Sequence, residues 1–214
     1  MKKFLSFGII FPLLLPMIYA YDPSKMLIIF FTKTNNTKKF SEYIKRITGI
    51  ESYQIVPLIP YIDNSTALSQ IAIEERNNNS RPEIEDPLTD INNYNTILLG
   101  YPLWHSHIPN ILITQIEKLN WEGKTIYPFN THGSSELGSS IEDIKQYALG
   151  ANVKDGFPIS QQKIKIEEAS MSEIKEWVKE NFEKEEEEEE EESLDSFKIL
   201  KLNYFVYFIL IMIL

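Results

Sequence analysis

Five short apolar runs, each followed by a segment with helical spacing, organise the middle of this chain. The runs occupy residues 26–32, 52–58, 94–102, 123–131 and 151–159. Segments at 37–49, 65–80, 108–120, 139–149 and 170–182 have the composition and apolar spacing of helices. Strands that alternate with helices form a parallel sheet covered on both faces, because each crossover helix packs back onto the sheet. The sequence therefore predicts an α/β fold, a doubly wound three-layer sandwich around a five-stranded parallel sheet.

Local signals predict where some of these helices end and which face they bury. Gly49 suits the end of the first helix, and Gly150 is expected to close the helix at 139–149, which Ser139 or Ser140 would cap. The inward residues of the last helix are expected to be Ile174, Trp177 and Val178.

The chain divides into four parts by composition. Of its 214 residues, 26–182 carry the alternating pattern and make one domain. Residues 1–20 have two lysines followed by an almost wholly apolar stretch and end in Ala20, which is typical of a signal peptide. An uncleaved anchor is the main alternative, and a buried element of the domain is a weaker one. The protein is therefore expected in the secretory pathway, secreted or attached to a membrane.

The C-terminal part is acidic and then apolar. Residues 183–196 form an acidic low-complexity spacer, in which nine Glu and one Lys account for most of the net charge of −10. The remainder is close to neutral and offers no broad field for nucleic acid. Residues 197–214 form an apolar tail, shorter than the roughly twenty residues of a full membrane span. A lipid-attachment signal, a short tail anchor and a sticky end without function remain open for it.

Some kinds of site are excluded by composition. The chain has no cysteine, so it has no disulfide, no thiolate nucleophile and no cysteine–metal site. His105 and His107 lie two residues apart, but no third ligand is near them in sequence, and a metal site is not expected.

Three loops are expected to converge where strands end. They follow the first, third and fourth strands and read "TKTNNT", "YPLWHSH" and "NTHGSSELGSS". In doubly wound sheets, ligands bind outside the carboxyl ends of the strands, at the point where the strand order reverses. The three loops are therefore the predicted ligand site.

The first loop has the features of a phosphate site. Thr32, Thr34 and Thr37 offer hydroxyl groups, and the first amides of the following helix are free to bind an anion. The glycine patterns of nucleoside-triphosphate and dinucleotide loops are absent. An ordinary capped helix is the alternative interpretation of this loop alone.

The second loop supplies an aromatic ring, and the third loop supplies glycines whose backbone could approach a ligand closely. Trp104 follows Pro102 at the end of a strand, where its ring could stack on a planar ligand or simply join the core. The third loop contains Gly133 and Gly138, which suit a backbone that passes close to a ligand. It lacks the Gly-x-Ser-x-Gly pattern of a hydrolase elbow.

These motifs, in this order and spacing, resemble the flavodoxin-like family. The similarity runs from residue 26 to about residue 159, and is strongest to the FMN-binding branch that includes NAD(P)H-quinone reductases. It rests on "TNNTKK", "LGYPLW" and "GKTIYPFNTHGSS", with support from "YIDN" and "RPEI". The resemblance implies the flavodoxin-like three-layer sandwich and FMN as cofactor.

The resemblance also implies residue roles. The FMN phosphate would be bound by Thr32, Lys33, Thr34, Asn35, Asn36 and Thr37. The isoalloxazine ring would be flanked by Pro102, Leu103, Trp104 and His105. A second flavin loop would be formed by Thr131, His132, Gly133, Ser134 and Gly138. No catalytic side chain is expected, because the flavin itself carries the redox chemistry.

Two functions follow from this resemblance. One is electron transfer, or NAD(P)H-dependent reduction of a quinone-like acceptor, with an unknown redox partner. The other is a non-redox, membrane-tethered module of the secretory pathway with a degenerate flavin site. Whether the protein is an enzyme depends on which of these functions it has.

Asn35 is the main departure from the family pattern. The family has glycine there, and asparagine is the non-glycine residue that best tolerates a positive φ. Asn35 also begins a glycosylation sequon, as do Asn64 and Asn78. A glycan on Asn35 would lie in the phosphate site, so FMN binding requires that this sequon stays unmodified.

Overall fold

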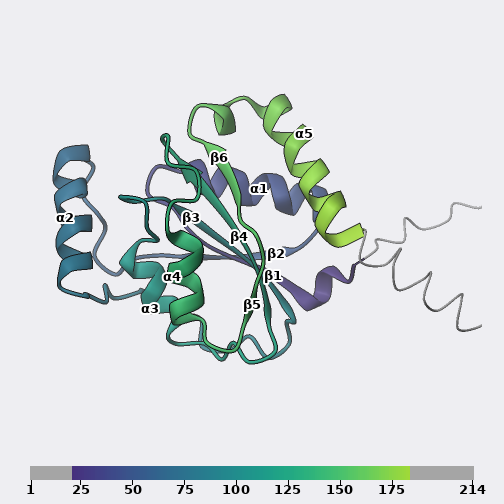
Figure 1. Cartoon of the computed structure of the whole chain (residues 1–214), viewed down its shortest axis with the longest axis horizontal. Helices are drawn as coiled ribbons and strands as arrows, with labels where there is room; N and C mark the ends of the chain where they lie inside the picture. The colour runs from purple at the N-terminus through teal and green to yellow at the C-terminus, as the bar shows by residue number, and fades with distance from the viewer. Residues whose placement is uncertain (1–20, 184–214) are drawn as a thin grey trace, which may run out of the picture.

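The computed structural model describes residues 21–183, which form a parallel sheet between two layers of helices (Figure 1). The strands are β1 (Met26–Phe31), β2 (Glu51–Ile55), β3 (Thr96–Pro102), β4 (Thr125–His132), β5 (Asn152–Val153) and β6 (Phe157–Ser160). Their order is β2-β1-β3-β4-β5, and β6 also pairs with β4. All strand pairs are parallel, which confirms the predicted α/β sandwich.

Four α-helices connect these strands, and a fifth follows β6. They are α1 (Asn36–Thr48), α2 (Ser65–Asn77), α3 (Asn110–Ile116), α4 (Ser140–Tyr147) and α5 (Glu167–Val178). Short 3₁₀ turns lie at Pro23–Lys25 and Lys163–Lys165, and one π-helical turn, Lys179–Glu183, follows α5. No helix among residues 21–183 is long and apolar enough to cross a membrane. The predicted signal peptide, the apolar tail and nearly all of the acidic spacer lie outside the described residues.

The sheet has a separate core on each face, because successive side chains of a buried strand point to opposite sides. Ile28 and Phe30 of β1 pack with α1 and α5 on one face. Ile29 and Phe31 pack with α3 and α4 on the other. The inward side of α5 is confirmed, since Ile174, Trp177 and Val178 are all buried.

Several helices differ by a few residues from their predicted bounds, and two of the shifted C-terminal ends have a local cause. The helix expected to reach residue 120 ends at Ile116, where the Trp121 indole N–H donates to the Ile116 carbonyl oxygen at 2.7 Å and ends the helix. The helix α4 is followed by Ala148, whose N–H bonds to Ile144. Gly150, expected as its cap, instead has a φ of 89° in the turn that leads to β5.

The fifth strand is divided into β5 and β6, where one strand was predicted. The break lies at residues 154–156 and includes Gly156. A Cβ on Gly156 would come within 2.5 Å of a Leu137 methyl, so this part of the chain is packed against the loop before α4. The pairing of β6 with β4 keeps the end of β4 covered, up to His132 opposite Ser160.

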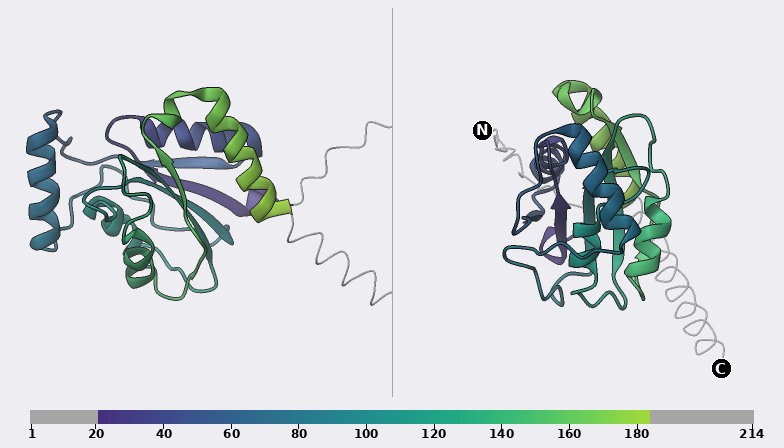
Figure 2. Two further views of the ribbon diagram at one scale, coloured as in Figure 1. Left: turned by 45° about the horizontal axis from the view of Figure 1, so that its top comes forward. Right: turned by 90° about the vertical axis from the view of Figure 1, so that its left-hand side faces the viewer.

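Helix α2 is packed differently from the other four α-helices. The Asn64 side chain caps its N-terminus by accepting from the Ala67 N–H at 2.9 Å, yet none of its thirteen residues is buried. In Figure 1 and in the left view of Figure 2, α2 lies apart from the two helix layers, beyond one end of the sheet.

Candidate functional site

The loop after β1 turns into α1 through Asn35. This residue has a φ of 61° and a ψ of 4°, the left-handed conformation expected where the family has glycine. No side chain caps the N-terminus of α1, so the first amides of the helix are available to an anion from outside. Thr34 and Asn35 are exposed at this point, which leaves the turn accessible.

The threonines of this loop have different surroundings. The Thr37 hydroxyl lies 3.0 Å from the Thr131 hydroxyl, so it links the start of α1 to the end of β4. The Thr34 hydroxyl accepts from the Asn36 amide at 3.2 Å. The Thr32 hydroxyl is buried and has no hydrogen-bond partner among the described residues. Of the three threonines predicted to bind the phosphate, Thr32 is therefore the one whose hydroxyl has no hydrogen-bond partner among the described residues.

Lys33 is held by the segment before α2. Its ammonium forms an ion pair with the Asp63 carboxylate at 2.5 Å. The Lys33 side chain is largely covered, whereas Asp63 is fully exposed. Lys33 thus joins the phosphate loop to residues 61–64, a contact that the sequence did not predict.

The loop after β3 forms a tight turn at residues 104–107. Trp104 and His107 exchange two backbone hydrogen bonds of 3.0 and 2.9 Å, and the two residues between them both have positive φ. This is the geometry of a two-residue hairpin turn, which glycine or asparagine usually occupies. The Leu103 N–H donates to the Thr131 carbonyl at 2.9 Å, so this loop lies directly beside the third one.

The Trp104 ring is half-buried, between the two alternatives that the sequence left open. It meets the Phe31 and Tyr61 rings edge-on, at centroid distances of 5.6 and 5.1 Å. It also lines a cavity of about 220 Å³ together with Leu68 and Ala72 of α2. The ring is thus fixed by its aromatic neighbours while it still borders open space.

The two histidines of the turn point to different helices. His105 lies 3.0 Å from the Ser69 hydroxyl of α2. His107 lies 2.9 Å from the buried carboxylate of Asp143 in α4, which also accepts from Arg76. Among the described residues, no group of three or more His, Asp or Glu side chains is arranged to hold a metal ion.

The loop after β4 contains a buried histidine ring and, next to it, backbone that no other protein atom covers. His132 is 8% exposed, and its Nδ1 has no partner among the described residues. Burial lowers the pKa of His132, and the nearby Glu136 carboxylate opposes this shift. A Cβ on Gly133 would meet no protein atom within 4 Å, so the backbone there faces free space.

Gly138 has a structural role within the protein. It has a φ of 52°, and a Cβ there would come within 2.5 Å of the Ser106 carbonyl oxygen. The following N–H, from Ser139, donates to that same oxygen at 2.7 Å. The close approach is therefore to the 104–107 turn, and a flavin contact at Gly138 stays a prediction.

Three buried polar atoms without partners mark the carboxyl ends of the central strands. They are Thr32 Oγ1, Asn130 Oδ1 and His132 Nδ1. Buried polar atoms are normally hydrogen-bonded, because an unmet partner costs about 1–3 kcal/mol. They lie within the first and third predicted loops or beside them. The residues of this edge therefore fit a ligand with several polar groups, such as a flavin nucleotide.

Sequence reasoning assigned no role to Tyr61, Asp63 and the inner face of α2. "YIDN" contributed to the resemblance, but nothing in it predicted that Tyr61 would pack against Trp104. The spacing of Leu68, Ile71 and Ala72 does indicate one helix face. This spacing is the sequence signal that could have identified the inner face of α2.

Comparison with known proteins agrees with this architecture. A sequence profile of the family described as Flavodoxin matches residues 25–181. A solved structure described as a flavoprotein of Bacteroides uniformis has 26% identity and a TM-score of 0.63, covering 73% of this chain and 98% of its own. A similar one from Bacteroides eggerthii has 29% identity and a TM-score of 0.57, covering 67% and 94%.

A third solved structure contains a ligand. It is a flavoprotein of Lactobacillus acidophilus in complex with FMN, with 25% identity and a TM-score of 0.54, covering 67% of this chain and 97% of its own. No protein with a curated description matches significantly. Because the family profile spans most of the chain, including every strand described above, the chain belongs to the flavodoxin family.

Proposed function

We propose that this protein binds FMN at the carboxyl ends of β1, β3 and β4 and functions as a flavoprotein. The observation that carries the proposal is the set of buried polar atoms without partners, Thr32 Oγ1, Asn130 Oδ1 and His132 Nδ1, at the edge where three loops converge. The related flavoprotein of Lactobacillus acidophilus, in complex with FMN, supports the choice of ligand.

Different residues at this edge would contact different parts of the cofactor. The amides that begin α1, with the Thr32 hydroxyl, would hold the phosphate. Trp104 would border the ring, and the open backbone at Gly133 would approach it from the third loop. Bound FMN supplies the redox chemistry, while the protein excludes water and sets the potential.

We further propose that this chemistry serves electron transfer or NAD(P)H-dependent reduction of a quinone-like acceptor. The family supports this class, and the redox partner is unassigned. The protein would act in the secretory pathway, secreted or membrane-attached, as its terminal segments indicate.

A non-redox module is the competing function, and one observation favours it. Asn35 is exposed and begins a sequon, so a glycosylating enzyme could reach it. A glycan there would cover the start of α1 and exclude the phosphate. Mass spectrometry of protein from a eukaryotic secretory host decides between the two: an occupied Asn35 site supports the module, and an unmodified one supports the flavoprotein.

Titration of the protein from a non-glycosylating host with FMN and with riboflavin tests the proposal. Thr32→Val should weaken FMN about tenfold, because one hydrogen bond to a charged group is lost, and should leave riboflavin unchanged. The free energy of unfolding without ligand should stay constant or rise, since the hydroxyl it removes is buried without a partner.

Thr48→Val, at the other end of the helix that follows this loop, is the matched control. The Thr48 hydroxyl already donates to the Ile44 carbonyl at 2.8 Å, so its loss should lower stability and leave FMN affinity unchanged. If FMN does not bind the wild-type protein, or if Thr32→Val weakens both ligands equally, the proposed phosphate site is wrong.

A further inference from the structure

Helix α2 and the segments on either side of it border a cavity that the predicted flavin loops do not line. The segment before α2 lies antiparallel to the segment after it, with Pro57 opposite Ile84. The Leu58 N–H donates to the Glu83 carbonyl oxygen at 2.8 Å, so the two segments are held together while α2 extends away from the sheet (Figure 1). The space beside them, here called the α2 cavity, has a volume of about 490 Å³, which is within the range of small-molecule sites.

Most of the wall of the α2 cavity is apolar. It is formed by Ile59, Pro60, Ile62, Ile71 and Pro82. Ile59 is 82% exposed and Ile62 is 48% exposed, although large aliphatic side chains are usually buried. A ligand in the cavity would remove part of this apolar surface from water, so the wall favours a ligand with an apolar part.

One carboxylate lines the α2 cavity without a positive partner. The Glu75 Oε2 atom accepts a hydrogen bond of 3.1 Å from the Tyr61 hydroxyl. Within residues 21–183, Glu75 forms no ion pair with a Lys, Arg or His side chain. Burial raises the pKa of the Glu75 carboxyl, because its charged form is less well solvated there. A partly buried carboxylate is costly when no positive group lies beside it, and a bound cation would offset this cost.

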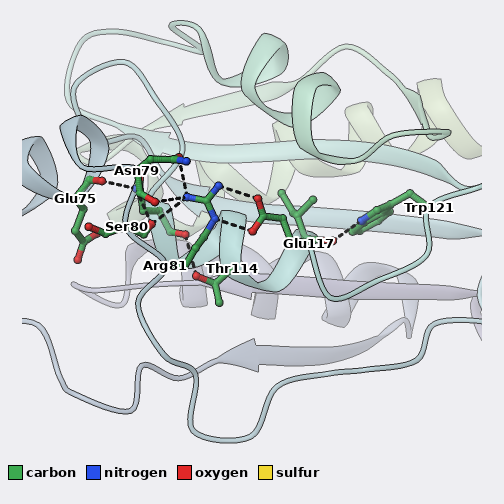
Figure 3. Close-up of polar contacts among 9 residues, drawn as sticks. Glu75, Asn79, Ser80, Arg81, Thr114, Glu117 and Trp121 are labelled. Atoms are coloured by element: carbon green, nitrogen blue, oxygen red, sulfur yellow. Dashed lines mark hydrogen bonds and ion pairs between the residues drawn. The ribbon is translucent and has the colours of Figure 1, made fainter.

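The cationic side chain in the wall of the cavity is bound to other partners. Arg81 donates hydrogen bonds of 2.7 Å to both carboxylate oxygens of Glu117 (Figure 3). Its third nitrogen donates to the Asn79 and Ser80 carbonyl oxygens at 2.9 and 3.1 Å. Each guanidinium nitrogen therefore has an acceptor within the protein, and Arg81 offers little to an anionic ligand.

Two further features give the α2 cavity a negative character. Glu83, on the segment after α2, also lines the cavity and is exposed. Glu75 lies in the last turn of α2, which ends at Asn77, and the C-terminal end of a helix is the negative end of its dipole. Charge in and around the cavity therefore disfavours an anion and favours a cation.

From this arrangement we propose that the α2 cavity binds an organic ammonium ion, with its charged group beside Glu75 and its apolar part against Ile62 and Ile71. The ammonium would donate to the carboxylate oxygen of Glu75 that Tyr61 does not contact. The residues that line this cavity are separate from those expected to hold FMN, so the inference does not rest on the proposed function.

Calorimetric titration of the full-length protein with phenethylammonium tests the proposal. Phenethyl alcohol has the same ring and chain but no charge. It should bind about tenfold more weakly, because its hydroxyl can donate to Glu75 but forms no ion pair. Phenylacetate, which carries a negative charge, should bind more weakly still. Equal affinity for the amine and the alcohol, or tighter binding of phenylacetate, would overturn the proposal.

Substitution of Glu75 identifies the partner of the ammonium group. Glu75→Gln keeps an oxygen that can accept from the Tyr61 hydroxyl, but it should lower the affinity for phenethylammonium about tenfold. Glu74→Gln is the matched control, since Glu74 is exposed on the same helix and does not line the cavity. An unchanged affinity in Glu75→Gln, or an equal loss in the two variants, would overturn the assignment of Glu75.

The dependence of binding on pH provides an independent test. The affinity for phenethylammonium should fall from about pH 7 to about pH 4, because the Glu75 carboxyl gains a proton while the ligand stays charged. Tyr61 and Arg81 keep their protonation states over this range, and Glu83 is the other group in the wall that titrates there. Glu83→Gln should therefore retain the fall, and Glu75→Gln should lose most of it. The opposite result would overturn the assignment.

Blocking the cavity tests its location. Ile71→Trp should abolish binding of phenethylammonium and leave FMN affinity unchanged, and Ile62→Trp is a second block if the first variant does not fold. Binding of the amine that survives in a folded block would overturn the proposal. A separate FMN titration of the wild type distinguishes the two ideas: failure to bind FMN alone removes the proposed function, and failure to bind the amine alone removes this inference.

Discussion

At the scale of single residues, one buried carboxylate organises the turn beside the predicted flavin ring. Asp143 accepts from the His107 ring at 2.9 Å, from the Ile108 N–H at 3.1 Å and from Arg76 at 2.9 Å. It thereby connects α4, the 104–107 turn and α2. Its side chain is 7% exposed, so these partners cannot be replaced easily by water.

Replacing Asp143 by alanine should lower the free energy of unfolding by about 2–3 kcal/mol, because several buried hydrogen bonds to a charged group are lost together. Urea unfolding of the protein without ligand measures this cost. Glu142→Ala is the matched control, since Glu142 is the neighbouring acidic residue and is exposed. An equal effect of the two substitutions would show that Asp143 is not an organising residue.

His132 should make the folded protein sensitive to acid. Burial holds the pKa of His132 below its ordinary value of 6.5, so folding favours the neutral ring. The stabilisation is present above the unfolded pKa and is lost as pH falls through the folded one. Unfolding measured from about pH 7 downwards should therefore show a smaller loss of stability in His132→Gln than in the wild type. His105→Gln, at an exposed ring, should match the wild type; if it flattens the curve as His132→Gln does, burial of His132 is not the cause.

At the scale of secondary-structure elements, α1 and α2 have the same length and opposite environments. Helix α1 buries Phe40, Tyr43 and Ile44 against the sheet, whereas α2 has no buried residue. Most helical stability in proteins comes from packing of an apolar face. Helix α2 is therefore held mainly by the Asn64 cap, by the ion pair of Arg76 with Asp143, and by the antiparallel pairing of Pro57 with Ile84 in the segments on either side of it.

Native-state hydrogen exchange should resolve this difference. Amides of α2 should exchange well before those of α1, because opening α2 exposes little buried apolar surface. Mass spectrometry of peptides covering the two helices measures the rates. Equal protection of the two helices without ligand would contradict this account.

At the scale of the whole molecule, the ends of the described domain meet in one aromatic cluster. The Phe182 ring lies 5.5 Å from Tyr21, 4.8 Å from Tyr127 and 5.6 Å from Trp177. Both ends lie on the side away from α2 (Figure 1). Among the described residues, Phe182 is therefore the last residue of the core, and it precedes the acidic spacer.

Phe182→Ala should lower the free energy of unfolding by about 3–4 kcal/mol, since it opens a cavity in this cluster. Deletion of residues 193–214 should leave the unfolding free energy unchanged, because every core residue described above precedes residue 183. Thermal and urea unfolding of the two variants measures the contrast. A deletion that destabilises the domain as much as Phe182→Ala would place part of the core in the tail.

The sequence alone determined the alternation of strands and helices, since apolar runs and helical spacing are local patterns. It also determined that Asn35 would need a positive φ, because the motif has glycine at a turn of fixed geometry. Only the tertiary structure decided contacts between distant segments. The position of Gly138 depends on Ser106, and Tyr61 reaches Trp104, which lies 43 residues further along the chain. No local pattern encodes these, because each depends on which loops the folded sheet brings to the same edge.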